Sequence, residues 1–200
     1  MKSDPIHFWY EFASTYSYVS VMRVHKVIEA AGGTLVWRPF LLGPTFAEQG
    51  WDDSPFNIYP RKGRYMWRDL ERLCEDYALP FSKPSVFPRN GLHAARVALV
   101  AHDQGWCPAF SRATFAANFA ADRDIGTVEV LTEIIADLGH DAAATLEMSR
   151  TATIKDRLRA QTEEARGLGV FGAPSFTVGD ELFWGNDRLG TAVAWSLGLR

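Results

Sequence analysis

The chain has 200 residues, of which 47% are hydrophobic and 22% are charged, a composition typical of one globular domain and too apolar for a disordered protein. Its 24 acidic and 21 basic residues give a formal net charge of −3, so the composition does not indicate a nucleic-acid-binding surface. No segment has the roughly 18 consecutive apolar residues of a membrane span, and the N-terminus lacks a signal-peptide pattern. We therefore expect a cytoplasmic protein that binds neither nucleic acid nor a membrane.

The N-terminal segment predicts a strand, a helix and a second strand. Residues 6–12 are an apolar run rich in aromatic side chains, which favours a strand buried on both faces. Residues 18–30 carry apolar side chains at helical spacing, Gly32 and Gly33 end that helix, and residues 34–38 predict the second strand. Such a unit predicts parallel strands joined by a right-handed crossover.

The middle of the chain, residues 60–167, predicts helices and no strand. Pro60 and Pro108 stand at first-turn positions, where the missing N–H of proline costs a helix nothing. The predicted helices cover residues 61–77, 92–104, 108–122, 127–138 and 153–166.

Strand patterns return near the C-terminus. Residues 175–178 and 181–184 flank a Gly-Asp pair, which is typical of a β-hairpin. The segment that follows predicts a last helix, with Asn186 or Asp187 as its N-cap.

This order of elements predicts an α/β fold: a thioredoxin-like four-stranded mixed sheet with a large all-helical insertion. Two parallel strands and the antiparallel hairpin make up the sheet. We expect residues 1–55 and 168–200 to form a discontinuous thioredoxin-like domain, and residues 56–167 to form the helical insertion domain.

Two patterns are better explained by structure than by ligand binding. Residues 167–172 match G-x-G-x-x-G, but a predicted helix precedes them and a strand follows, which reverses the order that a dinucleotide-binding fingerprint needs. Ordinary helix termination explains these glycines. The five histidines show no metal-ligand spacing, so we expect no metal site.

The two cysteines, Cys74 and Cys107, are too few for a disulfide-rich scaffold. Cys107 stands between Trp106 and Pro108, which is similar to the start of a thioredoxin active site, and a helix N-terminus there would favour a thiolate. No resolving cysteine follows it. We expect both cysteines in the core, with a reactive thiol at Cys107 as the alternative.

The segment Ser14-Thr15-Tyr16-Ser17 follows the first strand and opens the first helix. In a thioredoxin-like sheet this is the place of Cys-x-x-Cys, and serines occupy both cysteine positions here. A serine hydroxyl cannot form a disulfide, so dithiol exchange is excluded at this site. The segment instead offers a hydroxyl donor at a helix N-terminus, which favours an anion such as a thiolate supplied by a second molecule. The alternative is that Ser14 is a plain N-cap.

Several blocks of the sequence resemble one enzyme family. They are FWYEFASTYSY at 8–18, PRKGRY at 60–65, FGAPSF at 171–176 and WGNDRL at 184–189. They look like the 2-hydroxychromene-2-carboxylate isomerase family, kin to kappa-class glutathione transferases in the DsbA-like branch of the thioredoxin superfamily. The resemblance runs from end to end. It implies a DsbA-like or kappa transferase-like fold and a homodimer.

The resemblance implies roles for five residues. The family's glutathione-activating serine falls on Ser14, and its cis-proline falls on Pro174. The backbone of Ala173 would pair with the cysteinyl unit of glutathione like an added strand. Asp187 and Arg188 match the pair that holds the γ-glutamyl end, a carboxylate for its ammonium and a guanidinium for its carboxylate.

Two further residues are assigned to glutathione by the resemblance. Lys62 matches a lysine near glutathione or substrate in the kappa relatives, and Asn57 is placed in the same region. Lys62 also lies with two arginines at a predicted helix N-terminus, where cations are disfavoured, which is a hint of a bound anion; a solvated surface is the alternative. Thr15 departs from the family, which often has proline after the serine, and this leaves the exact substrate open.

The implied function is a glutathione-dependent cis–trans isomerase that acts on an aromatic 2-oxo or 2-hydroxy acid, with glutathione as cofactor. The Ser14 hydroxyl would stabilise the glutathione thiolate. One alternative keeps the site and changes the outcome to conjugation or peroxide reduction, as in kappa-class transferases. The other alternative is a redox-dead thioredoxin-fold protein that binds a partner at the cis-proline edge.

Overall fold

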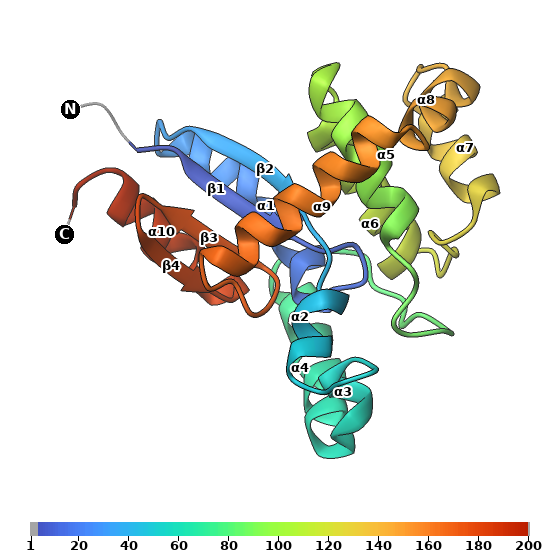
Figure 1. Cartoon of the computed structure of the whole chain (residues 1–200). Helices are drawn as coiled ribbons and strands as arrows, with labels where there is room; N and C mark the ends of the chain where they lie inside the picture. Colours follow the sequence, from blue (N-terminus) through green and yellow to red (C-terminus); the bar gives the residue numbers. More distant parts are fainter. Residues whose placement is uncertain (1–3, 200) are drawn as a thin grey trace.

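A four-stranded mixed sheet forms the centre of the protein. The computed structural model describes residues 4–199, and its strand order is β2-β1-β3-β4 (Figure 1). The strands are β1 (Ile6–Tyr10), β2 (Leu35–Pro39), β3 (Ser175–Val178) and β4 (Glu181–Trp184). β1 pairs with β2 in parallel, whereas β3 runs antiparallel to both β1 and β4. The predicted fold class is confirmed.

Helices connect and cover the strands. α1 (Thr15–Ala30) joins β1 to β2, and α9 (Ala152–Gly167) leads back to β3. After β4 come a 3-10 turn, η1 (Asn186–Arg188), and α10 (Leu189–Ser196). None of the described helices is both long and apolar enough to cross a membrane. Between β2 and α9 lie α2 (Gly43–Glu48), α3 (Pro55–Ile58), α4 (Pro60–Asp76), α5 (Leu92–Asp103), α6 (Cys107–Phe119), α7 (Val128–Asp137) and α8 (Ala142–Ser149).

Aromatic side chains fill the core on one face of the sheet. Phe8 stacks on Tyr10 and on Phe176, with ring centroids 5.1 and 5.2 Å apart, and all three are fully buried. Val21 and Val24 of α1 cover them at helical spacing. The same hydrophobic cluster continues through α5, α6 and α7, so the sheet and the helical region share one core.

Trp9 points to the opposite face, because side chains alternate along a strand. It packs with Phe40, Ala165 and Val170, and its indole N–H donates to the Thr177 hydroxyl at 3.0 Å. Figure 1 shows α9 crossing from the helical group to the sheet. The C-terminal end of α9 therefore closes this face.

The differences from the predicted elements are short helices. The sequence does not predict α2, α3 and α8, since six, four and eight residues are too few for apolar side chains to recur at helical spacing. Among the described residues, no strand lies between β2 and β3, as predicted. The G-x-G-x-x-G pattern begins at the end of α9 and precedes β3, which confirms that it ends a helix. The division into two domains stays a prediction.

The predicted cap of the last helix is wrong. Arg188 is the N-cap of α10 and Gly185 is that of η1, and no side chain caps either one. Asn186 is 7% exposed, and its Oδ1 accepts hydrogen bonds from Ser20 Oγ at 3.0 Å and from Arg23 Nη1 at 3.1 Å. Asn186 makes these contacts with α1 instead of capping the helix, because leaving a buried amide oxygen without a donor costs free energy. They fix η1 against α1.

A buried arginine joins the segment before α5 to the end of α6. The Arg89 side chain is only 4% exposed, and its Nη1 donates to Asn118 Oδ1 at 3.1 Å and to the Arg123 carbonyl at 2.8 Å. Its Nη2 pairs with the carboxylate of Asp122. These bonds satisfy polar groups that have little access to water.

We predict that Arg89→Met lowers the free energy of unfolding by about 2–3 kcal/mol, because it leaves buried oxygens without donors. Arg68→Met is the matched control, since Arg68 pairs with Glu71 on the exposed side of α4, where ion pairs contribute little. Chemical denaturation measures both variants. Equal effects of the two substitutions would contradict this role of Arg89.

Candidate active site

Ser14 occupies the N-cap of α1 and also contacts a distant loop. A tight turn after β1 places it there, with the Ser14 N–H donating to the Glu11 carbonyl at 3.0 Å. Its Oγ accepts from the Ser17 N–H at 3.2 Å and donates to the Ala173 carbonyl at 2.8 Å. The sequence leaves two roles open for Ser14, a plain N-cap or a residue of the site. The structure gives Ser14 the cap and, in addition, a contact with the segment before β3.

The Ala173–Pro174 peptide bond is cis, as the resemblance implies. The Pro174 carbonyl accepts from the Gly185 N–H at 2.9 Å, which ties this segment to the end of β4. The Ala173 N–H donates to no other described residue. A backbone with a free N–H beside a carbonyl can pair with an extended peptide in the manner of an added strand.

Asp187 and Arg188 lie on η1, the turn that follows β4. Their side chains are 72% and 55% exposed, and the carboxylate lies 3.5 Å from the guanidinium. Asn186 anchors this turn to α1 through the bonds described above. The pair thus offers one negative and one positive group on a fixed turn, which suits a zwitterionic ligand.

Tyr16 links the pieces of the site, and sequence reasoning gave it no role. Its hydroxyl donates to Asp69 of α4 at 2.9 Å, and its ring lies 6.3 Å from that of Phe56 of α3. Burial, the bond to Asp69 and the nearby charges, Asp187 among them, raise the pKa of Tyr16. The first turn of α1, η1 and α4 therefore converge on one side chain two residues after Ser14.

The predicted glutathione residues Lys62 and Asn57 have other partners in the structure. Lys62 is exposed in the first turn of α4, with Nζ 4.8 Å from the centroid of the Tyr59 ring. The Asn57 amide donates to Asp53 and to the Phe87 carbonyl at 3.0 Å, which holds α3 against the segment before α5. Neither contacts Ser14 directly, and both assignments stay predictions.

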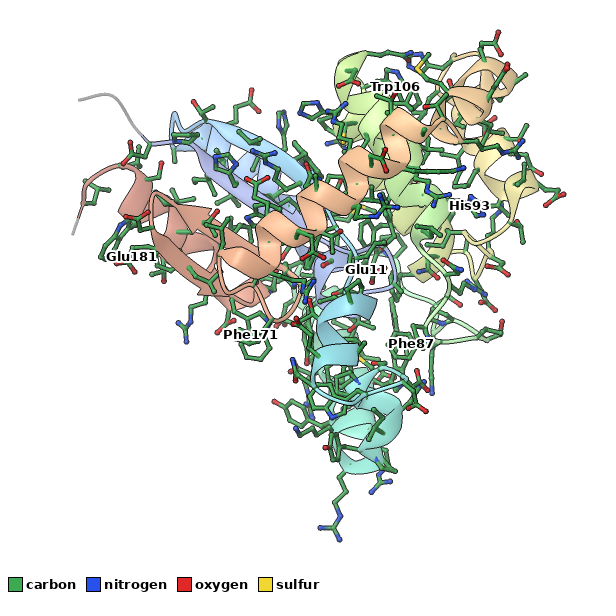
Figure 2. All side chains as sticks on the ribbon, viewed as in Figure 1. Glu11, Phe87, His93, Trp106, Phe171 and Glu181 are labelled. Carbon is green, nitrogen blue, oxygen red and sulfur yellow. The ribbon has the colours of Figure 1, made fainter. Side chains whose placement is uncertain are left out.

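Glu11 is a buried carboxyl that sequence reasoning did not single out. It lies three residues before Ser14 and is 9% exposed, and Figure 2 shows it in the middle of the molecule. Burial raises the pKa of Glu11 to about 7, although hydrogen bonds from the Ala13 and Ser14 backbone act in the opposite direction. No pattern in the sequence distinguishes a buried glutamate from an exposed one at the end of a strand.

Neither cysteine lies in this site. Cys107 is buried in hydrogen-bond contact with the Tyr10 and Ser111 hydroxyls, and burial raises the pKa of its thiol despite its place at a helix N-terminus. Burial likewise raises the pKa of Cys74 to about 11. Both are core thiols, as expected. Among residues 4–199, no group of three or more potential ligands could hold a metal ion.

Two exposed aromatic side chains border the cis-proline segment. Phe171 and Trp184 are 48% and 54% exposed, and their ring centroids lie 4.8 Å apart. Gly172 packs against the indole so closely that a Cβ there would be 2.5 Å from Nε1. Figure 2 shows Phe171 projecting outward from the loop after α9. The pair forms an apolar surface beside the segment that contains Ala173, since Phe171 precedes Ala173 by two residues and Trp184 pairs with Ser175.

Comparisons with known proteins agree with this geometry. The model of the DSBA-like thioredoxin domain matches residues 5–194. A 2-hydroxychromene-2-carboxylate isomerase of Sphingobium xenophagum is 30% identical over 185 residues, which cover 92% of this chain and 93% of that protein. Glutathione S-transferase kappa 2 of Caenorhabditis elegans is 26% identical over 198 residues, with 92% and 88% covered.

A solved structure extends the same likeness to the fold. The structure of a 2-hydroxychromene-2-carboxylate isomerase has a TM-score of 0.84 to this protein at 24% identity, with 98% of this chain and 99% of that chain covered. The resemblance seen in the sequence is thereby confirmed. The chain belongs to the DSBA-like thioredoxin domain family, in the group of the 2-hydroxychromene-2-carboxylate isomerases.

Proposed function

We propose that the protein is a glutathione-dependent cis–trans isomerase that acts on an aromatic 2-oxo or 2-hydroxy acid of the 2-hydroxychromene-2-carboxylate type. The carrying observation is the Ser14 hydroxyl, which lies at the N-terminus of α1 and 2.8 Å from the Ala173 carbonyl, where redox relatives would have a cysteine. The similarity to the Sphingobium xenophagum isomerase supports the type of reaction. The similarity to the Caenorhabditis elegans glutathione transferase supports glutathione as the cofactor.

The donors around Ser14 fit glutathione. The free N–H and the carbonyl of Ala173 match the backbone of its cysteinyl residue. Asp187 and Arg188 match the ammonium and carboxylate of its γ-glutamyl end, and Lys62 would hold the glycine carboxylate. Asn57, whose amide is held by the Phe87 carbonyl, stays assigned to glutathione binding by the resemblance.

Ser14 stabilises the thiolate form of the cofactor. Its hydroxyl hydrogen rotates from the Ala173 carbonyl to a sulfur beside it, while the amides of the first turn of α1 add a positive potential. When bound, glutathione would supply a thiolate nucleophile for a conjugated double bond; addition turns that bond into a single bond that can rotate, and elimination would return the thiolate. The enzyme keeps its own cysteines out of this chemistry.

The aromatic pair beside the site supports an aromatic acceptor. Phe171 and Trp184 expose their rings beside the segment that contains Ala173, and a flat apolar acid can stack on them while its reacting carbon faces the sulfur. Two cavities, of about 190 and 310 Å³, lie elsewhere and share no residue with this region.

Product analysis separates this proposal from its rivals. Isomerisation of 2-hydroxychromene-2-carboxylate returns all of the glutathione, whereas a kappa-type transferase consumes it in a stable conjugate. A peroxidase would oxidise it. Calorimetry with glutathione distinguishes a binding protein without enzymatic function, because no saturable heat at millimolar concentration would contradict both enzyme functions.

We predict that Ser14→Ala raises the pKa of enzyme-bound glutathione by about one to two units, because a hydrogen bond to a charged acceptor contributes about 1.5–3 kcal/mol. Thiolate absorbance followed against pH measures the change. The control is Ser149→Ala, which removes a buried hydroxyl on α8. An unchanged thiol pKa in Ser14→Ala would remove this role from Ser14.

We predict that Trp184→Ala raises KM for the aromatic acid about tenfold and leaves the pKa of bound glutathione unchanged, since loss of one aromatic stacking partner costs about 1–1.5 kcal/mol. Trp195→Ala is the matched control, because Trp195 is also partly exposed but packs on Phe183 from α10. Steady-state kinetics measures both. A similar KM in the two variants would exclude an acceptor site at this pair.

A further inference from the structure

Glu11 is a buried acid that the mechanism above does not use. Its Oε2 accepts from the Ala13 N–H at 2.9 Å, and its backbone carbonyl accepts from the Ser14 N–H. On its other side Gly91, the N-cap of α5, approaches so closely that a Cβ there would lie 2.6 Å from Oε1. The carboxyl is thus enclosed between the starts of α1 and α5.

No described cation pairs with this carboxyl. From the segment before α5, Arg89 turns to Asp122. His93 lies in the first turn of α5, and its charged neighbours are other arginines. Figure 2 shows His93 away from Glu11. The Tyr16 hydroxyl of α1 donates to a carboxylate of α4, so it is not a donor to Glu11. Apart from backbone N–H groups such as that of Ala13, no described group offsets a negative charge on Glu11, and its buried surroundings screen that charge poorly.

The thiolate proposed at Ser14 would be a second anion beside the same turn. Two like charges in a weakly screened site oppose each other, and one of the groups then holds a proton. We propose that Glu11 is a positioning residue that shares a single negative charge with the thiolate bound at Ser14. This rests on the proposed function. The thiol gives up its proton to solvent and Glu11 takes one up, so the site gains no net charge.

The ionisation of Glu11 suits this exchange. Burial raises the pKa of its carboxyl to about 7, so the group is about half protonated at neutral pH. A rise of about one unit in that pKa on thiolate binding takes up about 0.4 of a proton, and half a proton is the upper limit. An exposed glutamate, fully ionised at pH 7, has no such capacity.

Glu11→Gln tests the coupling, because the amide oxygen still accepts from the Ala13 N–H while the charge is lost. We expect the pKa of bound glutathione to fall by about one unit, from the interaction of two charges within roughly 10 Å at an effective dielectric of about 20. Glu29→Gln removes an exposed charge from α1 and serves as the control. Thiolate absorbance against pH gives both values.

Proton release provides a second readout that a merely structural role does not change. Calorimetry of glutathione binding at pH 7, in buffers of different ionisation enthalpy, should show up to about half a proton more released by Glu11→Gln than by the wild type. In the wild type alone, the thiolate titration should follow two apparent pKa values rather than one. This measurement keeps the test open if the variant does not fold.

The stability of the protein without glutathione tests the titration of Glu11 itself. Since the folded protein holds this proton more tightly than the unfolded chain, its stabilisation is complete below about pH 4.5 and is lost as the pH rises through about 7. The wild type should lose stability over this range relative to Glu11→Gln. If glutathione binds and Ser14→Ala raises its pKa while Glu11→Gln changes neither pKa nor proton release, only the coupling is overturned. If glutathione does not bind, the proposed function fails as well.

Discussion

The antiparallel pairing of β1 with β3 is the constraint on which the site depends. It brings Ser14 and Ala173 together across 159 residues of chain. The register is fixed on both faces, by the stack of Phe8 on Phe176 and by the bond from Trp9 to Thr177. A slip of one residue would turn the Phe176 ring to the opposite face, so the aromatic core also determines which backbone group faces the Ser14 hydroxyl.

This constraint explains why a long insertion does not disturb the site. The entropy lost on closing a loop grows only with the logarithm of its length, so a helical insertion between β2 and β3 adds little to the cost of pairing β1 with β3. The insertion also stabilises the sheet, since α5, α6 and α7 share its hydrophobic cluster. Through Tyr16 and Asp69 it supplies one wall of the site.

Sequence reasoning reached the parts of the site that depend on position along the chain. Ser14 was found because it follows a strand and opens a helix, and the hairpin was found because its turn residues separate two β-favouring runs. Tyr16, Asn186 and Glu11 were missed because their roles depend on partners far away in sequence, or on burial. Ser20, for example, lies 166 residues from Asn186. Patterns within an element do not show which elements meet.

Under the proposed function, the site exerts two opposing influences on the sulfur of bound glutathione. The N-terminus of α1 and the Ser14 hydroxyl favour a thiolate, whereas the buried carboxyl of Glu11 opposes a second negative charge. A thiolate that is stabilised too strongly is a weak nucleophile, and the best attacking thiol has a pKa near the ambient pH. An isomerase needs its thiolate both to add to a double bond and to leave it again. Under the proposed coupling, a buried acid with a pKa of about 7 beside the helix N-terminus would hold the pKa of the bound thiol within that range, which a serine and a helix dipole alone would not do.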